Sequence, residues 1–297
     1  IQNAPWKGIE IKTVFFLINL IFRLPKIVKE FKPDVILFSS MVTASLAKFT
    51  RHKIDVPMVT INHGQDVKMP IKMYQYYVPK VFKALDGVIS VSRATRQECI
   101  KRGMSPEKGV ALPNGFDMED FKIAPKRAHA RETISEKFGL NLDKSALLLT
   151  VGRQVERKGH EWFITEVLPN IKSDVVYMAI GDGPQHKRLL EISSKSALKE
   201  RIILTGKQSD KVLRNAYAAA DLFIMPNVPI EGDMEGFGIV LLEANLSGTP
   251  AVAADLEGIK DVIEDGKNGY KIEVRNNKDF ANKVDSLLQS DLTEFSE

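Results

Sequence analysis

The chain has 297 residues, of which 44% are hydrophobic and 27% charged, and its formal net charge is +4. This length accommodates two domains with separate cores, and the composition excludes a disordered, fibrous or low-complexity protein. The single cysteine, Cys99, excludes an internal disulfide and indicates a reducing compartment, so we expect a cytoplasmic location. Cysteine and histidine residues do not cluster with the spacing of a zinc site, and we expect no bound metal.

The charge is unevenly distributed. Residues 1–120 hold 18 Lys and Arg against 11 Asp and Glu, a net charge of +7, whereas residues 121–297 hold 24 against 27, a net charge of −3. A basic first half indicates an anionic partner such as a membrane surface or a phosphorylated acceptor, and a merely soluble basic surface is an equally good interpretation. Residues 68–83, rich in Lys, Tyr and Met, could dock an interfacial lipid acceptor or form an ordinary surface helix.

Short apolar runs alternate with helical patterns along the chain. The most apolar run, residues 13–27, is interrupted by polar residues and falls short of the roughly 20 apolar residues that span a bilayer, so it predicts a buried or interfacial helix. In the first half we expect strands at 35–38, 56–61, 87–92 and 110–113, and helices at 41–51, 74–84 and 93–102.

The second half repeats this alternation after a polar connector. We expect strands at 146–152, 175–180, 201–207 and 222–226, and helices at 131–139, 161–171 and 239–244. Strands that alternate with helices predict a parallel, doubly wound sheet in each half.

Residues 233–244 (DMEGFGIVLLEA) combine two carboxylates with a Gly-aromatic-Gly turn and a helical pattern. Gly236 and Gly238 allow the backbone to approach a ligand closely, and the helix after them directs free N–H groups at a phosphate or at sugar hydroxyls. Eight helical residues rise about 12 Å, so Glu235 and Glu243 could hold opposite ends of a nucleoside diphosphate sugar. The spacing alone favours a simpler interpretation, a buried helix with one capping and one solvated glutamate.

Three further segments carry candidate chemistry. His63 follows an expected strand at its carboxyl end, where α/β sheets bind ligands, although a loop histidine without a role is equally compatible. Arg153 and Lys158 occupy a strand-to-helix loop and could clamp a diphosphate, although such loop cations are more often simply exposed. Residues 181–184 (GDGP) begin like a dinucleotide fingerprint, but His186 replaces its third glycine, which disfavours an NAD dehydrogenase.

Together these motifs resemble, in order and spacing, the family 4 retaining glycosyltransferases of the GT-B fold. The matching segments are His63-Gly64-x-Asp66, Asn114-Gly115-x-Asp117, Arg153 with Lys158-Gly159, the G-x-G-P turn at 181–184, and the E-x7-E signature from Glu235 to Glu243. The resemblance implies an α/β protein with two Rossmann-like, doubly wound domains facing across a cleft. It assigns residues 1–122 to the acceptor side and 123–297 to the nucleotide sugar. It also implies truncation at both ends, without the first strand and the closing helix.

The resemblance assigns a role to each candidate residue. Glu235 lies by the donor sugar, Glu243 holds the ribose hydroxyls, and His63 hydrogen-bonds near the sugar and the acceptor. Arg153 and Lys158 neutralise the diphosphate during catalysis. The remaining donor-binding positions are the backbone amides of Gly236, Phe237 and Gly238 and, as a weaker candidate near the base, Lys207.

The resemblance implies a metal-independent enzyme that moves a hexose, with retained configuration, from a nucleoside diphosphate sugar to an acceptor hydroxyl. The acceptor would be a lipid or glycan of the cell envelope. The expected partners are the donor and a sugar or lipid acceptor, with peripheral contact to the inner face of the membrane and no nucleic acid. The donor is a substrate, and no cofactor is expected. Two alternatives stay open, a nucleotide-sugar epimerase of the same fold and a non-catalytic nucleotide-sugar binder.

Overall fold

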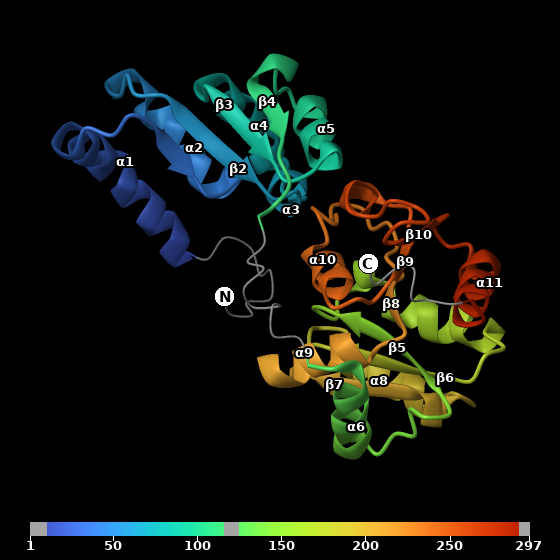
Figure 1. Cartoon of the computed structure of the whole chain (residues 1–297). Helices are drawn as coiled ribbons and strands as arrows, with labels where there is room; N and C mark the ends of the chain where they lie inside the picture. Colours follow the sequence, from blue (N-terminus) through green and yellow to red (C-terminus); the bar gives the residue numbers. More distant parts are fainter. Residues whose placement is uncertain (1–10, 116–124, 291–297) are drawn as a thin grey trace. The chain divides into compact units, whose positions relative to one another are not determined.

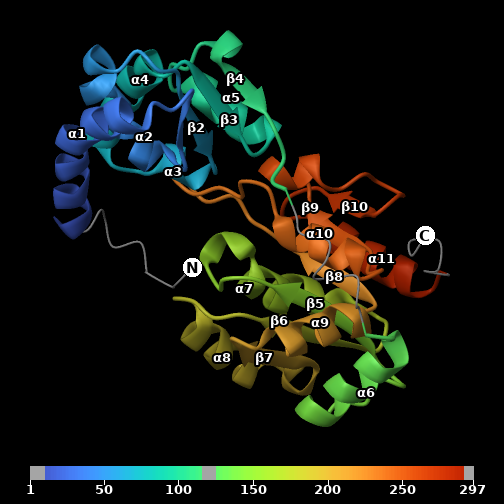
Figure 2. The same ribbon diagram turned by 60° about the vertical axis from the view of Figure 1, so that its left-hand side comes forward.

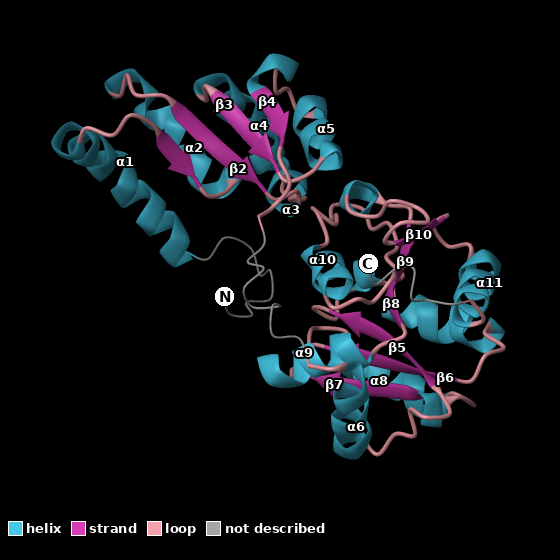
Figure 3. Cartoon of the chain, viewed as in Figure 1, coloured by secondary structure: helices cyan, strands magenta, loops and turns pink. Residues whose placement is uncertain are grey.

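The computed structural model describes residues 11–115 and 125–290, and the chain divides into two compact units. The first unit comprises residues 1–114 and 231–237, and the second comprises residues 115–230 and 238–297. Each unit is built on its own parallel sheet, which confirms the α/β class (Figure 3). The predicted boundary at residue 122 and Asp117 of the connector lie outside the described residues.

The first unit contains a four-stranded parallel sheet in the order β1-β2-β3-β4, so each strand pairs with the next one along the chain (Figure 1). The strands are β1 (Ile36–Phe38), β2 (Met58–Asn62), β3 (Gly87–Ser90) and β4 (Gly109–Ala111). The helices are α1 (Ile11–Phe31), α2 (Met41–Thr50), α3 (Gln65–Lys68), α4 (Lys72–Ala84) and α5 (Arg93–Lys101).

Local sequence fixes where two of these helices begin. Ser40 precedes α2 and Ser92 precedes α5, and their side chains accept hydrogen bonds from the N–H groups of Thr43 (3.4 Å) and Thr95 (3.0 Å). Such caps satisfy N–H groups that lack a partner within the helix. The chain leaves α5 at Gly103, whose φ of +90° is accessible to glycine, and this confirms the predicted stop.

Helix α1 forms over a longer stretch than predicted, and one of its faces packs on the core of the first unit. This face presents Leu17, Leu20, Ile21, Leu24 and Val28. The opposite face is exposed and carries both aromatic and basic side chains. Within residues 11–115 and 125–290, no helix combines the length and apolar character that crossing a bilayer requires.

The second unit contains a six-stranded parallel sheet in the order β10-β9-β8-β5-β6-β7 (Figure 2). The strands are β5 (Ala146–Val151), β6 (Val175–Ile180), β7 (Ile202–Gly206), β8 (Leu222–Met225), β9 (Ala251–Ala254) and β10 (Gly269–Ile272). The helices are α6 (Arg127–Phe138), α7 (His160–Trp162), α8 (His186–Lys195), α9 (Asp210–Ala219), α10 (Ile239–Leu246) and α11 (Asn277–Leu288). The chain proceeds from β5 to one edge and from β8 to the other, so the order reverses between these strands, where doubly wound sheets bind ligands.

Two helices differ from the prediction. The helix expected over 161–171 is interrupted after α7 by a π-helix, Phe163–Val167, and a 3-10 turn, Leu168–Asn170. Proline at the second residue of this turn cannot continue the α-helical hydrogen bonds.

Helix α6 begins four residues earlier than expected. The reason is tertiary, because Arg127 and Arg131, one turn apart, both pair with Asp221, at 2.6 and 2.9 Å.

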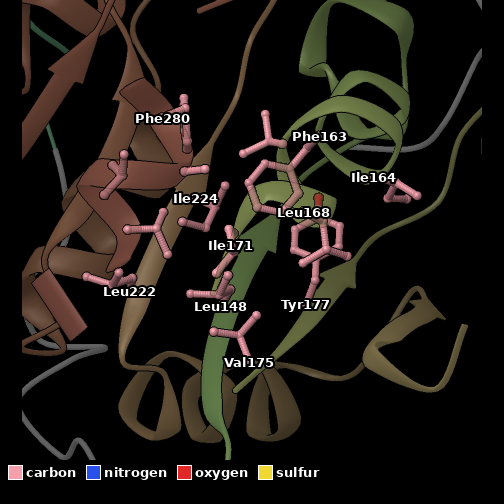
Figure 4. Close-up of a cluster of buried hydrophobic side chains, with 14 of the residues drawn as sticks. Leu148, Phe163, Ile164, Leu168, Ile171, Val175, Tyr177, Leu222, Ile224 and Phe280 are labelled. Atoms are coloured by element: carbon pink, nitrogen blue, oxygen red, sulfur yellow. The ribbon is translucent and has the colours of Figure 1, made fainter. Parts of the chain in front are cut away.

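The core of the second unit lies between its sheet and the irregular segment after α7 (Figure 4). The Phe163 ring contacts Tyr177 of β6 and Phe280 of α11, with ring centroids 4.6 and 5.9 Å apart. The Tyr177 hydroxyl lies 2.9 Å from Nδ1 of His160. Burial, and secondarily the charge of Lys158, lowers the pKa of His160 to about 3, so this ring is neutral at pH 7.

The loops that follow β5 and β8 touch backbone to backbone. Gly159 has a φ of +68°, and a Cβ at this position would lie 1.9 Å from the carbonyl oxygen of Pro226. The N–H of Val228 also donates to the carbonyl of Arg157 at 2.9 Å. Only glycine combines this backbone conformation with this close approach.

We expect Gly159→Ala to lower the midpoint of urea unfolding strongly, at a cost of about 3 kcal/mol, because the loops must separate. The matched control is Gly139→Ala, since Gly139 has nearly the same φ, +66°, and a methyl group added there would meet nothing within 4 Å. The control should cost about 1 kcal/mol, from backbone strain alone. Equal losses would show that the contact with Pro226 does not matter.

We expect His160 to make the protein acid-sensitive. Its pKa is lowered to about 3 in the folded state, so below its ordinary value of 6.5 the unfolded chain binds a proton that the folded chain does not. The free energy of unfolding should fall by about 1.4 kcal/mol per pH unit from this group between pH 6 and 4. His160→Gln should flatten the curve relative to wild type in urea titrations. His129→Gln, at a 72% exposed side chain, should change it far less.

Candidate functional site

The loop after β5 carries the two predicted cations at the point where the strand order reverses. Arg153 and Lys158 both follow β5, as predicted. Lys158 is buried, at 7% exposure, and its side chain folds back so that Nζ lies 3.8 Å from where a Cβ of Gly152 would stand. A buried ammonium at the carboxyl end of the sheet stabilises negative charge there.

The G-D-G-P turn after β6 supports this loop from one side. A Cβ on Gly181 would lie 2.0 Å from the carbonyl oxygen of Gly152, and one on Gly183 would lie 2.4 Å from that of Gln154. The N–H of Gln154 donates to the carbonyl of Asp182 at 2.9 Å. The turn therefore fixes the path of the backbone on both sides of Arg153. Its role here is structural.

Helix α10 begins at Ile239, as predicted, after Gly238 in the left-handed conformation (φ +87°, ψ +53°). Glu243 is its fifth residue, about 6 Å along the axis from the first. This corrects the expectation that eight helical residues, rising about 12 Å, separate Glu235 from Glu243. The two glutamates do not share a helix, because the helical backbone begins only after Gly238.

A tyrosine that the sequence did not single out holds Glu243. The hydroxyl of Tyr217, in α9, donates to Oε2 of Glu243 at 2.6 Å. Tyr217 is fully buried, and burial, followed by the charge of Glu243, raises its pKa well above the ordinary value. It therefore stays a hydrogen-bond donor and orients the carboxylate. The available signal was one large polar side chain in a run of alanines (AYAAAD).

Lys207 follows β7, the edge strand of the second sheet, and its side chain is exposed. Strand β6 lies between β7 and β5, so Lys207 belongs to the margin of the sheet and not to the loop that carries Arg153 and Lys158. A cavity of about 330 Å³ flanks that loop on residues such as Glu156 and Trp162, but Arg153, Lys158 and Glu243 do not line it.

In the first unit, His63 follows β2 and is exposed, as predicted. Its Nε2 lies 3.1 Å from the carbonyl oxygen of Ser39, and its backbone N–H donates to Oδ1 of Asp66 at 3.1 Å. The other oxygen of Asp66 accepts from the N–H of Met41 at 2.9 Å. Burial raises the pKa of Asp66, and these hydrogen bonds oppose the shift. Asp66 thus ties the loops after β1 and β2 together.

The segment Glu231–Phe237 belongs to the first unit and packs on the His63 loop. A Cβ on Gly236 would lie 2.1 Å from the carbonyl oxygen of His63, and one on Gly64 would lie 3.0 Å from Sδ of Met234. The side chains of Glu235 and Phe237 are buried, at 8% and 6% exposure. The structure therefore brings the backbone of Gly236, the residue after Glu235, against that of His63, although the two are far apart in sequence.

The candidate residues form two groups, each within one unit. The first unit holds His63, Glu235, Gly236 and Phe237, and the second holds Arg153, Lys158, Gly238, Glu243 and Lys207. Among residues 11–115 and 125–290, no three His, Cys, Asp or Glu side chains gather in a way that could hold a metal ion.

Both units match known families. Residues 145–290 match the family described as "Glycosyl transferases group 1", and residues 6–120 match "Glycosyltransferase Family 4". The structure is similar to Anabaena HepE in complex with UDP, with a TM-score of 0.79 and 22% identity, over 94% of this chain and 75% of that one. This likeness shows the GT-B fold.

Two relatives of similar sequence are named glycosyltransferases. One is the Escherichia coli UDP-Gal:alpha-D-GlcNAc-diphosphoundecaprenol alpha-1,3-galactosyltransferase, 26% identical over 87% of this chain and 67% of the relative. The other is the Mycobacterium leprae phosphatidyl-myo-inositol mannosyltransferase, 26% identical over 87% of this chain and 65% of the relative. The chain spans about two thirds of the length of each. With both family matches, the described fold and the E-x7-E segment in agreement, the chain belongs to the group 1, family 4 glycosyltransferases of the GT-B fold.

Proposed function

We propose that this chain transfers a hexose from a nucleoside diphosphate sugar to an acceptor hydroxyl, with retention of the anomeric configuration. The observation that carries the proposal is Glu243, held by Tyr217 in the first turns of α10, in the same unit as the Arg153 and Lys158 loop. An oriented carboxylate suits the two ribose hydroxyls, and a pair of cations suits a diphosphate.

The charges of the second unit fit the departure of a nucleoside diphosphate. This leaving group develops negative charge as the sugar bond breaks, and fixed cations stabilise that charge without reorganisation. Arg153 can present a bidentate fork, while Lys158 supplies a point charge. A strong general acid is not needed, and we assign no covalent nucleophile. Retention would follow from attack on the same face, with the leaving phosphate accepting the proton of the acceptor hydroxyl.

His63 and Glu235 would serve the sugar and the acceptor. The carbonyl of Ser39 can only accept a hydrogen bond, so Nε2 of His63 carries the hydrogen in their contact. In the neutral ring, Nδ1 is then an acceptor, suited to a sugar hydroxyl. The backbone contact between His63 and Gly236 would keep this ring and the Glu235 carboxylate in a fixed relation.

The names of the relatives support an acceptor in lipid-linked or cell-envelope glycan synthesis, and we propose the same class here. The acceptor would then be reached at the cytoplasmic face of a membrane, which the chain would contact peripherally through its basic first unit. An epimerase would release nucleotide without an acceptor, and a non-catalytic binder would retain donor affinity without turnover. Acceptor-dependent release of nucleotide separates the transferase from both.

We expect UDP, GDP or ADP, or one of their sugars, to raise the melting temperature of the protein, because a ligand of the folded state stabilises it. Glu243→Ala should abolish most of this shift. Tyr217→Phe should weaken nucleotide binding about tenfold, because a hydrogen bond to a charged group is lost. The matched control is Glu200→Ala, at a 90% exposed side chain, which should leave the shift unchanged. Wild-type nucleotide affinity in Glu243→Ala would refute the assigned ribose contact.

We expect Glu235→Ala to lower kcat at least a hundredfold while nucleotide affinity changes less than threefold, since its proposed contact is with the sugar. Steady-state kinetics with the sugar nucleotide that raises the melting temperature most would measure kcat. Titration with the nucleotide would measure its affinity. The opposite pattern, with nucleotide binding lost and kcat kept, would show that Glu235 contacts the nucleotide and not the sugar. In the Glu243→Ala variant the loss should fall mainly on the donor KM.

A further inference from the structure

The first unit contains an apolar groove that the proposed donor site does not use. It encloses about 410 Å³ between α1, α2 and α4. The side chains on which the argument depends are Leu17, Val42, Phe49, Met73, Tyr76 and Lys80. A cavity of this size, with apolar walls and a few polar groups, is typical of a small-molecule site.

The walls of the groove are unusually exposed for such side chains. Met73 is 81% exposed, Tyr76 72% and Phe49 49%, within the described part of the chain. Covering this surface would be favourable roughly in proportion to the apolar area removed from water. Large apolar patches with a polar rim commonly mark sites that bind an apolar ligand or surface.

Helix α1 also carries exposed aromatic and basic side chains, on the side opposite the one that packs on the core. Phe15 and Phe22, 67% and 69% exposed, lie seven residues apart and thus on the same side of the helix. Lys12, Arg23 and Lys26 are also exposed. Aromatic and basic side chains on one helical face suit the boundary between lipid headgroups and acyl chains.

The three helices around the groove are strongly basic. They contain eight Lys and Arg residues and one acidic residue, Glu30. Helix α4 alone has Lys72, Lys80 and Lys83 and no Asp or Glu. The ammonium of Lys80 lies 3.9 Å from the centre of the Tyr76 ring, at the mouth of the groove. An occupant with a hydrocarbon part and an anionic head would match both the walls and the rim.

The groove is joined to the His63 region within the same unit. Ile71 lines both the groove and a second cavity of about 340 Å³, whose walls also include Gln65 and residues 231–233. Gln65 is two residues from His63, and residues 231–233 lead to Glu235. The groove and the second cavity therefore adjoin at Ile71, and the second cavity lies close in sequence to the residues that we assign to the acceptor.

We propose that the acceptor is a phosphate-bearing lipid whose hydrocarbon chain occupies the α1–α2–α4 groove, with its phosphate beside Lys80 and its sugar end toward His63. The proposal rests on the proposed transferase function and specifies its acceptor. The names of both curated relatives, a diphosphoundecaprenol and a phosphatidylinositol enzyme, contain a lipid joined to phosphate, which fits this chemistry.

The test uses the whole chain with decyl phosphate as the probe and ethyl phosphate as the headgroup alone. In isothermal titration calorimetry, decyl phosphate below its micellar concentration should bind at least a hundredfold more tightly than ethyl phosphate. The double variant Met73→Glu, Tyr76→Glu places carboxylates at two exposed wall positions and should weaken decyl phosphate binding at least tenfold. Lys80→Ala should weaken it about fivefold through the phosphate.

The matched control is Leu190→Glu, a similar change at an exposed, 46% accessible position of α8 in the second unit, which should bind decyl phosphate as wild type does. All variants should keep the nucleotide-induced rise in melting temperature, which reports the donor site separately. Equal binding of decyl and ethyl phosphate, or wild-type binding by the double variant, would overturn the lipid site while leaving the transferase proposal standing. Binding to phosphatidylglycerol vesicles without binding of decyl phosphate would also overturn it, in favour of simple surface docking.

Discussion

The arrangement of Arg153 and Lys158 depends on backbone packing at the carboxyl ends of β5, β6 and β8. Gly159 meets Pro226, and Gly181 meets Gly152, at distances that leave no room for a side chain. These contacts bring three loops to one end of the second sheet through the backbone itself. The cations Arg153 and Lys158 then project from a backbone whose course is already fixed. Electrostatic stabilisation of a leaving group needs such prior organisation, because flexible cations would spend part of their interaction energy on ordering.

In the second unit, burial fixes the protonation state of two side chains that lie beside charged groups. Burial keeps His160 neutral next to Lys158, so His160 does not add a further positive charge to the loop at pH 7. Burial also keeps Tyr217 protonated, so it can donate to Glu243. In both cases the low polarity of the core fixes a protonation state, and the protonation state fixes a hydrogen bond.

The sequence was informative wherever a local pattern determines structure. Buried strands were located from short apolar runs, and the start of α10 at Ile239 was located from the glycine before it. The family assignment from motif order is confirmed by both family matches. Features set by distant residues could not be read in this way. The early start of α6 depends on Asp221, and the role of Tyr217 depends on Glu243 in another helix.

The assignment of residues 231–237 to the first unit has a consequence for how the protein is made. A ribosome completes residues 1–114 long before it adds the seven residues that pack on Gly64 and the His63 carbonyl. Until then, the first unit lacks a segment that packs on the loop after β2, and that segment is made only after residues 115–230. Packing around His63 is therefore completed only during synthesis of the second unit.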